Sequence, residues 1–364
     1  MRKILAFAFL ALTILGCGGD GGKNPTVGKD GTVTGLAKYK IATSIYAGWM
    51  PWYYAKEKGI VKKWADKYGI EIEVLYMDYV PSVEAFVAGK VDACTMTNME
   101  ALNMPAAAGI DSTAIIVGDY SNGNDAVLVR DAVTLESMKE AMLCELTVSQ
   151  YLLARGLESV GRKESDVKIL NVSDADIATA FVTDKSKQVT VTWNPMVQQL
   201  ELQPGVTRIY DSSKIPGEIL DLMVINTEVS KKDPRLAKAL TGAWFEVLAL
   251  MSQRGPESEA ALTEMAKLSN CTLAEYKAQL KTTAMFWTAK EAQDFAESAE
   301  LQKSMDLVRK FSFEHGMLGQ GVKSADAVGM AFPDGKILGD KDKVKLRYSA
   351  EFMKEAVAEK PSSK

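Results

Sequence analysis

The 364-residue chain contains a single histidine, His315, and this scarcity removes several classes of catalytic site. A Ser-His-Asp triad needs a histidine beside its nucleophile, and most histidine-based zinc sites need two or three. His315 stands directly before Gly316, where a histidine commonly closes a helix, so we expect it to be structural. Basic residues number 43 against 47 acidic ones, and no cluster of five or more lysines and arginines occurs. This balance predicts no nucleic-acid partner.

Motifs of nucleotide, hydrolase and zinc-protease sites are also missing. The sequence has no G-x-S-x-G, no Walker A motif, no G-x-G-x-x-G and no H-E-x-x-H. The polar segment 121–125 follows a predicted strand without a phosphate-loop pattern and is interpreted as a turn. Cys94, Cys144 and Cys271 lack the spacing of metal ligands and are expected to be buried. We therefore expect no metal, no cofactor and no enzymatic activity.

The first residues have the pattern of a targeting segment. Arg2 and Lys3 precede an apolar run over 4–15, which is too short for a permanent membrane span. The run ends at Cys17 in a sequence that resembles a bacterial lipobox, whose cysteine is lipidated after cleavage. We expect a signal peptide at 1–16, a lipid anchor on Cys17 and a glycine-rich flexible tether at 17–37. The alternative is an ordinary secretory peptide with a chance cysteine.

From residue 38 to 226 the pattern alternates between strands and helices, as in βαβ units with a mostly parallel sheet. Period-two or short apolar runs predict strands over 39–43, 70–77, 93–97, 114–118, 126–129, 143–146, 167–170, 189–192 and 221–226. Longer amphipathic runs predict helices over 50–68, 80–88, 99–108, 135–142, 150–160 with a cap at Ser149, and 175–182.

The remainder is predicted to be mainly helical, through 234–252, 256–267, 273–281, 289–299 and 301–315. This order predicts an α/β protein with two lobes and a helical C-terminal third. We expect lobe 1 to begin at 38–129, lobe 2 to cover 130–221, and the chain to return to lobe 1 over 222–364.

Aromatic residues gather where predicted strands end, which is where α/β proteins bind ligands. Tyr46 and Trp49 lie between the first strand and the next helix, with Pro51 suited to the first helical turn. Trp193 ends a later strand. We expect these three side chains to contact a ligand, the alternative for Trp193 being burial in the core.

Charge at the predicted strand ends is one-sided. Lys214 is the single base counted there. The acids are Asp78, Glu84, Glu100, Asp119, Asp125, Glu145, Asp174, Asp176, Asp211, Glu218 and Asp221. An oxyanion site would need arginine, lysine, histidine or free helix N-termini, whereas a cation favours carboxylates with aromatic faces. The imbalance predicts a cationic or neutral polar ligand, with Asp119 among its candidate contacts.

The chain from about 38 to 332 resembles the solute-binding proteins of ABC importers in the nitrate/sulfonate/taurine class. More narrowly, six segments resemble the branch associated with urea carboxylase genes. They are SIYAGWMPWYYA (44–55), DACTMTNMEAL (92–102), VGDYSNGND (117–125), SDADI (173–177), VTWNP (191–195) and IPGEILDLMVIN (215–226). The resemblance implies a two-lobed periplasmic-binding-protein fold of type II.

By position, the resemblance implies ligand contacts in the cleft beyond the aromatic ones. They are Asp78, Asn98, Glu145, Ser149 and Glu218. It also implies a monomeric lipoprotein of the cell envelope, periplasmic or extracytoplasmic, whose partners are an ABC permease with its ATPase and a small ligand, guanidinium before urea. Three alternatives stay open, namely a urea receptor, a sensory lipoprotein, and an enzyme like the thiamine pyrimidine synthases. That enzyme depends on an active-site histidine, and His315 lies in the wrong region.

Overall fold

A computed structural model describes residues 26–27, 33–34 and 36–358. The predicted signal peptide and Cys17 lie outside these residues. Within the predicted tether, strands β1 (Thr26–Val27) and β2 (Val33–Thr34) pair antiparallel. In the part of the chain that is described, no helix is both long and apolar enough to cross a membrane.

The larger of two main sheets has nine strands and contains the first and last described strands of the folded body. Its order is β15-β14-β16-β6-β12-β5-β3-β4, with β13 also paired to β6. The bounds are β3 Ala37–Thr43, β4 Ile70–Tyr76, β5 Ala93–Thr97, β6 Ser112–Ser121, β12 Leu220–Asn226, β13 Thr283–Met285, β14 Gly329–Ala331, β15 Ile337–Leu338 and β16 Val344–Tyr348. Strands β3, β4 and β5 are parallel, and β12 runs antiparallel between β5 and β6.

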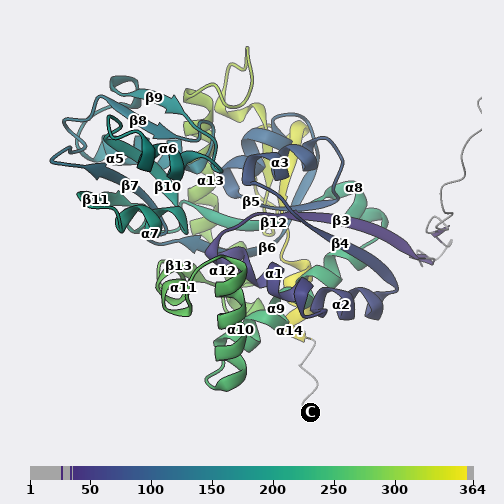
Figure 1. Cartoon of the computed structure of the whole chain (residues 1–364). Coiled ribbons are helices and arrows are strands. Elements are labelled where there is room, and N and C mark those ends of the chain that lie inside the picture. The colour runs from purple at the N-terminus through teal and green to yellow at the C-terminus, as the bar shows by residue number, and fades with distance from the viewer. Residues whose placement is uncertain (1–25, 28–32, 35, 359–364) are drawn as a thin grey trace, which may run out of the picture.

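The smaller sheet has five strands in the order β11-β7-β10-β8-β9. Their bounds are β7 Asp125–Arg130, β8 Glu140–Leu143, β9 Lys168–Asn171, β10 Val189–Trp193 and β11 Val206–Asp211. The chain passes between the sheets twice, once from β6 to β7 and once from β11 to β12. Figure 1 shows the five-stranded sheet on one side of the molecule and the nine-stranded sheet on the other.

Helices cover both sheets, and most begin within two residues of their predicted starts. Their bounds are α1 Met50–Glu57, α2 Ile60–Tyr68, α3 Tyr79–Val87, α4 Asn98–Ala101, α5 Val148–Ser159, α6 Ile177–Thr183, α7 Met196–Glu201, α8 Thr227–Lys232, α9 Arg235–Ser252, α10 Pro256–Leu268, α11 Leu273–Leu280, α12 Ala289–Ala296, α13 Ala299–Glu314 and α14 Glu351–Ala358. The predicted helix 50–68 is broken at Gly59, whose φ of 70° is a left-handed conformation that glycine adopts without strain.

One predicted helix, over 135–142, is wrong, and so is the strand after it. The structure has strand β8 there, because Ala141, Met142 and Leu143 are buried between its parallel neighbours β9 and β10. Leu135 and Met138 lie one helical turn apart, but they are buried in the turns that precede the strand. A short strand that is apolar on both faces is difficult to distinguish from a buried helix by periodicity.

The predicted helical C-terminal third is confirmed, with the short strands β13, β14, β15 and β16 as an addition that the pattern did not indicate. Helix α9 buries Leu240, Trp244 and Leu248 against the nine-stranded side of the molecule. His315 is the C-cap of α13, as expected, and its ring stacks on Phe311 at 3.9 Å.

Candidate ligand-binding site

A cavity opens between the two sheets. The residues that line it are Tyr46, Trp49, Tyr79, Thr97, Asp125, Val148, Trp193, Ile219 and Asp221. They come from the ends of β3, β4, β5 and the start of β12 on one side, and from β7, β10 and the start of α5 on the other. Because both sheets contribute to its wall, the cavity is placed to receive a ligand between them.

Four aromatic rings form a continuous chain around the cavity. Tyr46 and Trp49 contact edge to face with 5.1 Å between ring centroids, and Trp49 lies 5.5 Å from Tyr79. Tyr79 in turn lies 5.8 Å from Trp193, which ends β10. Tyr79 is the first residue of α3, which follows β4 of the nine-stranded sheet. Its ring therefore meets Trp193 of the five-stranded sheet across the gap between the sheets. We name these four residues the aromatic cage.

Three aspartates lie beside the aromatic cage, and all are buried. Asp119 and Asp221 are paired across strands β6 and β12, and Asp125 is paired with Trp193 across β7 and β10. Burial raises the pKa of Asp119 to about 7, although the hydrogen bonds that it receives act in the opposite direction. Burial likewise raises the pKa of Asp125 to about 7. Burial also raises the pKa of Asp221 well above its usual range, and the negative charge of Asp119 acts in the same direction.

Glycine at position 48 permits the close approach between Asp119 and the aromatic cage. A Cβ atom at Gly48 would lie 2.5 Å from Asp119 Oδ2 and 2.5 Å from Tyr46 Cε1. Real Cβ atoms are not found at such distances, so any larger residue would move one of these two side chains. The loop after β3 therefore needs glycine here for packing.

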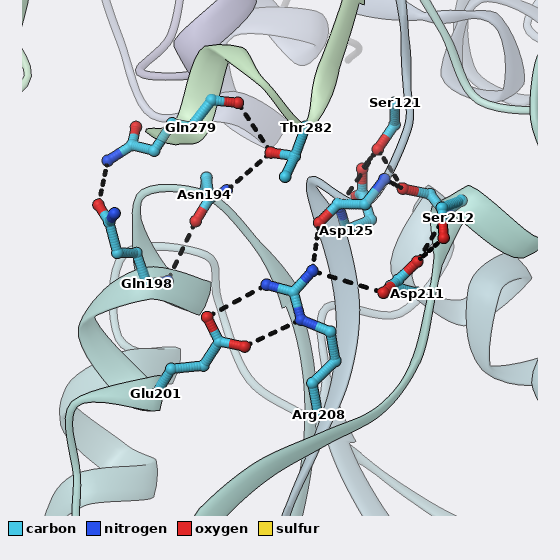
Figure 2. Close-up of polar contacts among 12 residues, drawn as sticks. Ser121, Asp125, Asn194, Gln198, Glu201, Arg208, Asp211, Ser212, Gln279 and Thr282 are labelled. Carbon is cyan, nitrogen blue, oxygen red and sulfur yellow. Dashed lines mark hydrogen bonds and ion pairs between the residues drawn. The ribbon is translucent and has the colours of Figure 1, made fainter. Parts of the chain in front are cut away.

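Polar contacts tie the two chain crossings together beside the cavity. Ser121 Oγ donates to Asp125 Oδ2 at 2.5 Å and lies 2.6 Å from Ser212 Oγ, which also accepts from Gly123 N at 2.7 Å. Figure 2 shows this group next to Arg208, which forms a two-pronged ion pair with Glu201. Asp125 is thus held directly by Ser121 and is linked through Ser121 to Ser212 on the second crossing.

Of the residues predicted to bind ligand, three line the cavity and a fourth adjoins it. Tyr46, Trp49 and Trp193 are lining residues, and Asp119 accepts a hydrogen bond from the Tyr46 hydroxyl at 3.1 Å. The structure thus brings these four predicted residues together at one cavity.

The other five predicted residues do not line the cavity. Glu218 is held by Arg155 and Tyr151, and Asn98 bonds the backbone of Glu218 and Leu220. Asp78 and Glu145 are exposed to solvent.

Ser149 is buried in the first turn of α5 with its hydroxyl unpartnered. The prediction that Ser149 caps this helix is wrong. The cap is Thr147, whose side chain accepts a hydrogen bond from the Ser149 N–H.

Tyr79, Thr97, Val148 and Ile219 were not predicted. Each is next in sequence to a predicted residue, so at these strand ends and at this helix start the cavity is lined by the neighbour of the residue that we predicted. Asp125 and Asp221 were counted among the acids without being selected. Among residues 26–27, 33–34 and 36–358, no group of three or more histidines, cysteines or acids is arranged to hold a metal ion.

No family model and no curated protein matches the sequence. Solved structures do match it in fold. The alkanesulfonate-binding protein SsuA from Xanthomonas axonopodis pv. citri, bound to MOPS, has a TM-score of 0.64 and 15% identity, over 78% of this chain and 94% of that one. SsuA from Escherichia coli has a TM-score of 0.63 and 17% identity, over 79% of this chain and 96% of that one.

A third match is a Candida albicans protein described as having the generic periplasmic-binding-protein fold. It has a TM-score of 0.58 and 12% identity, over 75% of this chain and 90% of that one. At such identities the likeness concerns architecture, which agrees with the two sheets and the cavity between them. The chain has the periplasmic-binding-protein fold.

Proposed function

We propose that the protein is the extracytoplasmic substrate-binding component of an ABC importer and that it captures guanidinium. The observation that carries this proposal is the composition of the cavity wall. Asp125 and Asp221 line it beside the aromatic cage, Asp119 lies directly behind, and none of the described lining residues is basic.

Physical chemistry favours a planar cation in such a cavity. Buried carboxyls without a positive partner are costly, and here that cost appears as raised pKa values. A cation that enters restores the ionised carboxylates and receives charge-assisted hydrogen bonds of about 1.5–3 kcal/mol each. Stacking on aromatic faces adds about 0.5–2 kcal/mol per contact. Two contacts of each kind are compatible with micromolar binding, about −8 kcal/mol, after ordering costs.

The sulfonate-binding proteins that share the fold are named for anionic ligands, and this cavity differs from what an anion needs. An oxyanion would lie against Asp125 and Asp221 with no basic residue among the described lining. Urea has the shape of guanidinium but lacks its charge, and its carbonyl oxygen requires a donor. The proposed function therefore keeps the importer role that the fold supports and changes the charge of the ligand.

The remaining elements of the proposal concern location and partners. Cleavage before Cys17 and lipidation of that residue would hold the protein at the outer face of a membrane. The ligand-bound form would then deliver its solute to a permease driven by an ATPase. Lobe 1 (38–129 and 222–364) and lobe 2 (130–221) would close on the ligand by hinge rotation at the two chain crossings.

Isothermal titration of residues 18–364 tests the ligand directly. Guanidinium chloride, urea and methanesulfonate are titrated separately into the wild type, into Asp221→Asn and into Asp294→Asn. Asp294 is an exposed carboxylate paired with Lys290, so its variant is a matched control for loss of one negative charge. We expect saturable guanidinium binding that Asp221→Asn removes and Asp294→Asn retains. Urea binding without guanidinium binding would contradict the cation proposal.

A further inference from the structure

Two helices begin at the cavity wall, and each receives a carboxylate from the opposite side of the cavity. Helix α5 begins at Val148, whose N–H donates to Glu100 Oε1 at 3.0 Å. Helix α3 begins at Tyr79, whose N–H donates to Asp174 Oδ2 at 3.0 Å. Val148 and Tyr79 both line the cavity.

The two contacts cross between the sheets in opposite directions. Glu100 follows β5 of the nine-stranded sheet and reaches a helix that follows β8 of the five-stranded sheet. Asp174 follows β9 of the five-stranded sheet and reaches a helix that follows β4 of the nine-stranded sheet. Together they form a reciprocal pair of bridges across the cavity.

The N-terminus of α5 retains no unbonded N–H in its first turn. Val148 N is bonded to Glu100, while Ser149 N donates to Thr147 Oγ1 at 3.2 Å and Gln150 N donates to Thr147 O at 3.0 Å. A helix N-terminus carries partial positive charge and free donors, which makes it a natural place for an anion. In this protein that place is taken by a side chain of the chain itself.

Glu100 is built into its position. Its side chain is fully buried, and the Thr97 hydroxyl donates to its second carboxylate oxygen. The Tyr79 hydroxyl also acts on it and, like the other donors, favours the ionised form against the effect of burial, which raises the pKa of Glu100. Of these partners the Val148 N–H can only donate, so it requires an acceptor oxygen on Glu100.

We infer that Glu100 and Asp174 determine specificity by acting as built-in anions: each binds the first N–H of a helix that begins at the cavity, and together they exclude anionic solutes and hold the two sides together. The inference rests on the proposed function only in taking the cavity to be the solute site. It deepens that function by assigning the rejection of anions to two residues outside the cavity lining. It also explains how a fold shared with sulfonate-binding proteins can present helix N-termini that an anion does not reach.

The test uses residues 18–364 and four variants, Glu100→Ala, Glu100→Gln, Asp174→Asn and the double variant Glu100→Ala/Asp174→Ala. Asp92→Asn is the matched control, because Asp92 also accepts a backbone N–H, from Lys40 at 2.8 Å, but at the other end of β5. Each protein is titrated with methanesulfonate, nitrate and guanidinium chloride, and its radius of gyration is measured by small-angle scattering. Circular dichroism establishes which variants are folded.

We expect methanesulfonate or nitrate to bind the Glu100→Ala and double variants and neither the wild type nor Asp92→Asn. Glu100→Gln keeps an acceptor for Val148 N but loses the charge, so its guanidinium affinity should fall by about tenfold. The double variant should have a larger radius of gyration without ligand. Folded variants with wild-type dimensions and no anion binding would overturn the inference.

Two outcomes separate this inference from the proposed function. Failure of the wild type to bind guanidinium contradicts the proposed function, while a gain of anion binding in the variants still supports the inference. If the alanine variants do not fold, Glu100→Gln and Asp174→Asn decide, since each retains the side-chain size. If both variants then keep the guanidinium affinity and the radius of gyration of the wild type, the inference is overturned.

Discussion

The hydroxyl of Tyr46 donates a hydrogen bond to Oδ1 of Asp119 at 3.1 Å, and within the described chain Oδ2 of that carboxyl has no partner. This places an oriented, half-satisfied carboxyl directly behind the aromatic cage. Its paired neighbour across the strands is Asp221, which lines the cavity. A cation that binds between the aromatic cage and these acids would therefore meet two carboxyls already aligned by the sheet.

Replacing Tyr46 with phenylalanine should weaken cation binding more at neutral pH than at pH 9. The variant removes the hydrogen bond that favours the ionised form of Asp119, so the pKa of Asp119 should rise further. We expect guanidinium affinity to fall by about tenfold at pH 7, which corresponds to one lost charge-assisted hydrogen bond. Titration calorimetry at both pH values measures this.

The matched control for that variant is Tyr348→Phe, which removes a buried hydroxyl that contacts Met305 rather than a carboxyl. Its affinity for guanidinium should equal that of the wild type. An equal loss in both variants would mean that Tyr46 acts through general packing instead of through Asp119.

Gly48→Ala should reduce binding through shape alone. Its Cβ would lie 2.5 Å from both Asp119 Oδ2 and Tyr46 Cε1, so one of these side chains must move into the cavity or away from it. We expect guanidinium affinity to fall by at least about tenfold, since a misplaced contact costs roughly one hydrogen bond. Gly89→Ala is a control for a glycine with open space, although its positive φ adds backbone strain. A Gly48→Ala variant with unchanged affinity would contradict the close packing.

Ligand binding should strengthen as the pH rises. The pKa values of Asp119 and Asp125 are near 7, so both carboxyls are largely protonated at pH 5 and ionised at pH 9. Each proton that must leave before the cation binds makes the affinity rise by up to about tenfold per pH unit below pH 7. Titrations in buffers of different ionisation enthalpy should show proton release on binding at pH 6. A flat profile would contradict this prediction.

The stability of the ligand-free protein should fall as the pH rises, whereas ligand binding strengthens. A carboxyl whose pKa is raised by folding binds more protons in the folded than in the unfolded state, so the free energy of unfolding falls as pH rises from about 4 to above 7. Carboxyls with lowered pKa values, such as Asp233 and Asp306, change the free energy of unfolding with pH only below about pH 4. Denaturant unfolding at pH 6 and pH 8 measures the difference in the free energy of unfolding between the two pH values. This difference should be smaller in Asp125→Asn.

Much of the fold was predictable because strands and helices differ in period. The alternation in 70–77 and the apolar run in 93–97 correspond to β4 and β5 within one residue. Strand β8 was not predictable, since its two buried faces result from neighbours β9 and β10, which the local pattern does not contain. Strand β16 is likewise fixed by its parallel pairing with β6, more than 220 residues earlier in the chain.

The sequence predicted site residues at the strand ends, and the structure places some of them in the cavity wall and others next to it. The sequence indicated Asp78, whereas Tyr79 lines the cavity, and it indicated Glu218, whereas Ile219 does. Successive residues at a strand end point in different directions, so a shift of one position selects a side chain that does not line the cavity. Glu218 illustrates a second limit, because its ion pair with Arg155 depends on a helix more than 60 residues away.

Glu218 and Asp221 therefore provide the sharpest comparison between a structural acid and a site acid. Glu218 accepts from Arg155 Nε at 2.9 Å, Arg155 Nη2 at 3.1 Å and the Tyr151 hydroxyl at 2.5 Å. Glu218→Gln should lower the free energy of unfolding by about 1–3 kcal/mol and leave guanidinium affinity unchanged. Asp221→Asn should do the reverse, because it removes a buried carboxyl that Asp119 repels and that the cation needs.

Calorimetry and denaturant unfolding at pH 8 measure both quantities for both variants. We expect Asp221→Asn to be more stable than the wild type and unable to bind guanidinium, whereas Glu218→Gln binds it and is less stable. Loss of binding in Glu218→Gln with normal binding in Asp221→Asn would exchange the two roles and place the cation on the other side of Ile219. A protein that gains stability when it loses a site carboxyl keeps that group for its ligand, since the folded chain alone gains nothing from it.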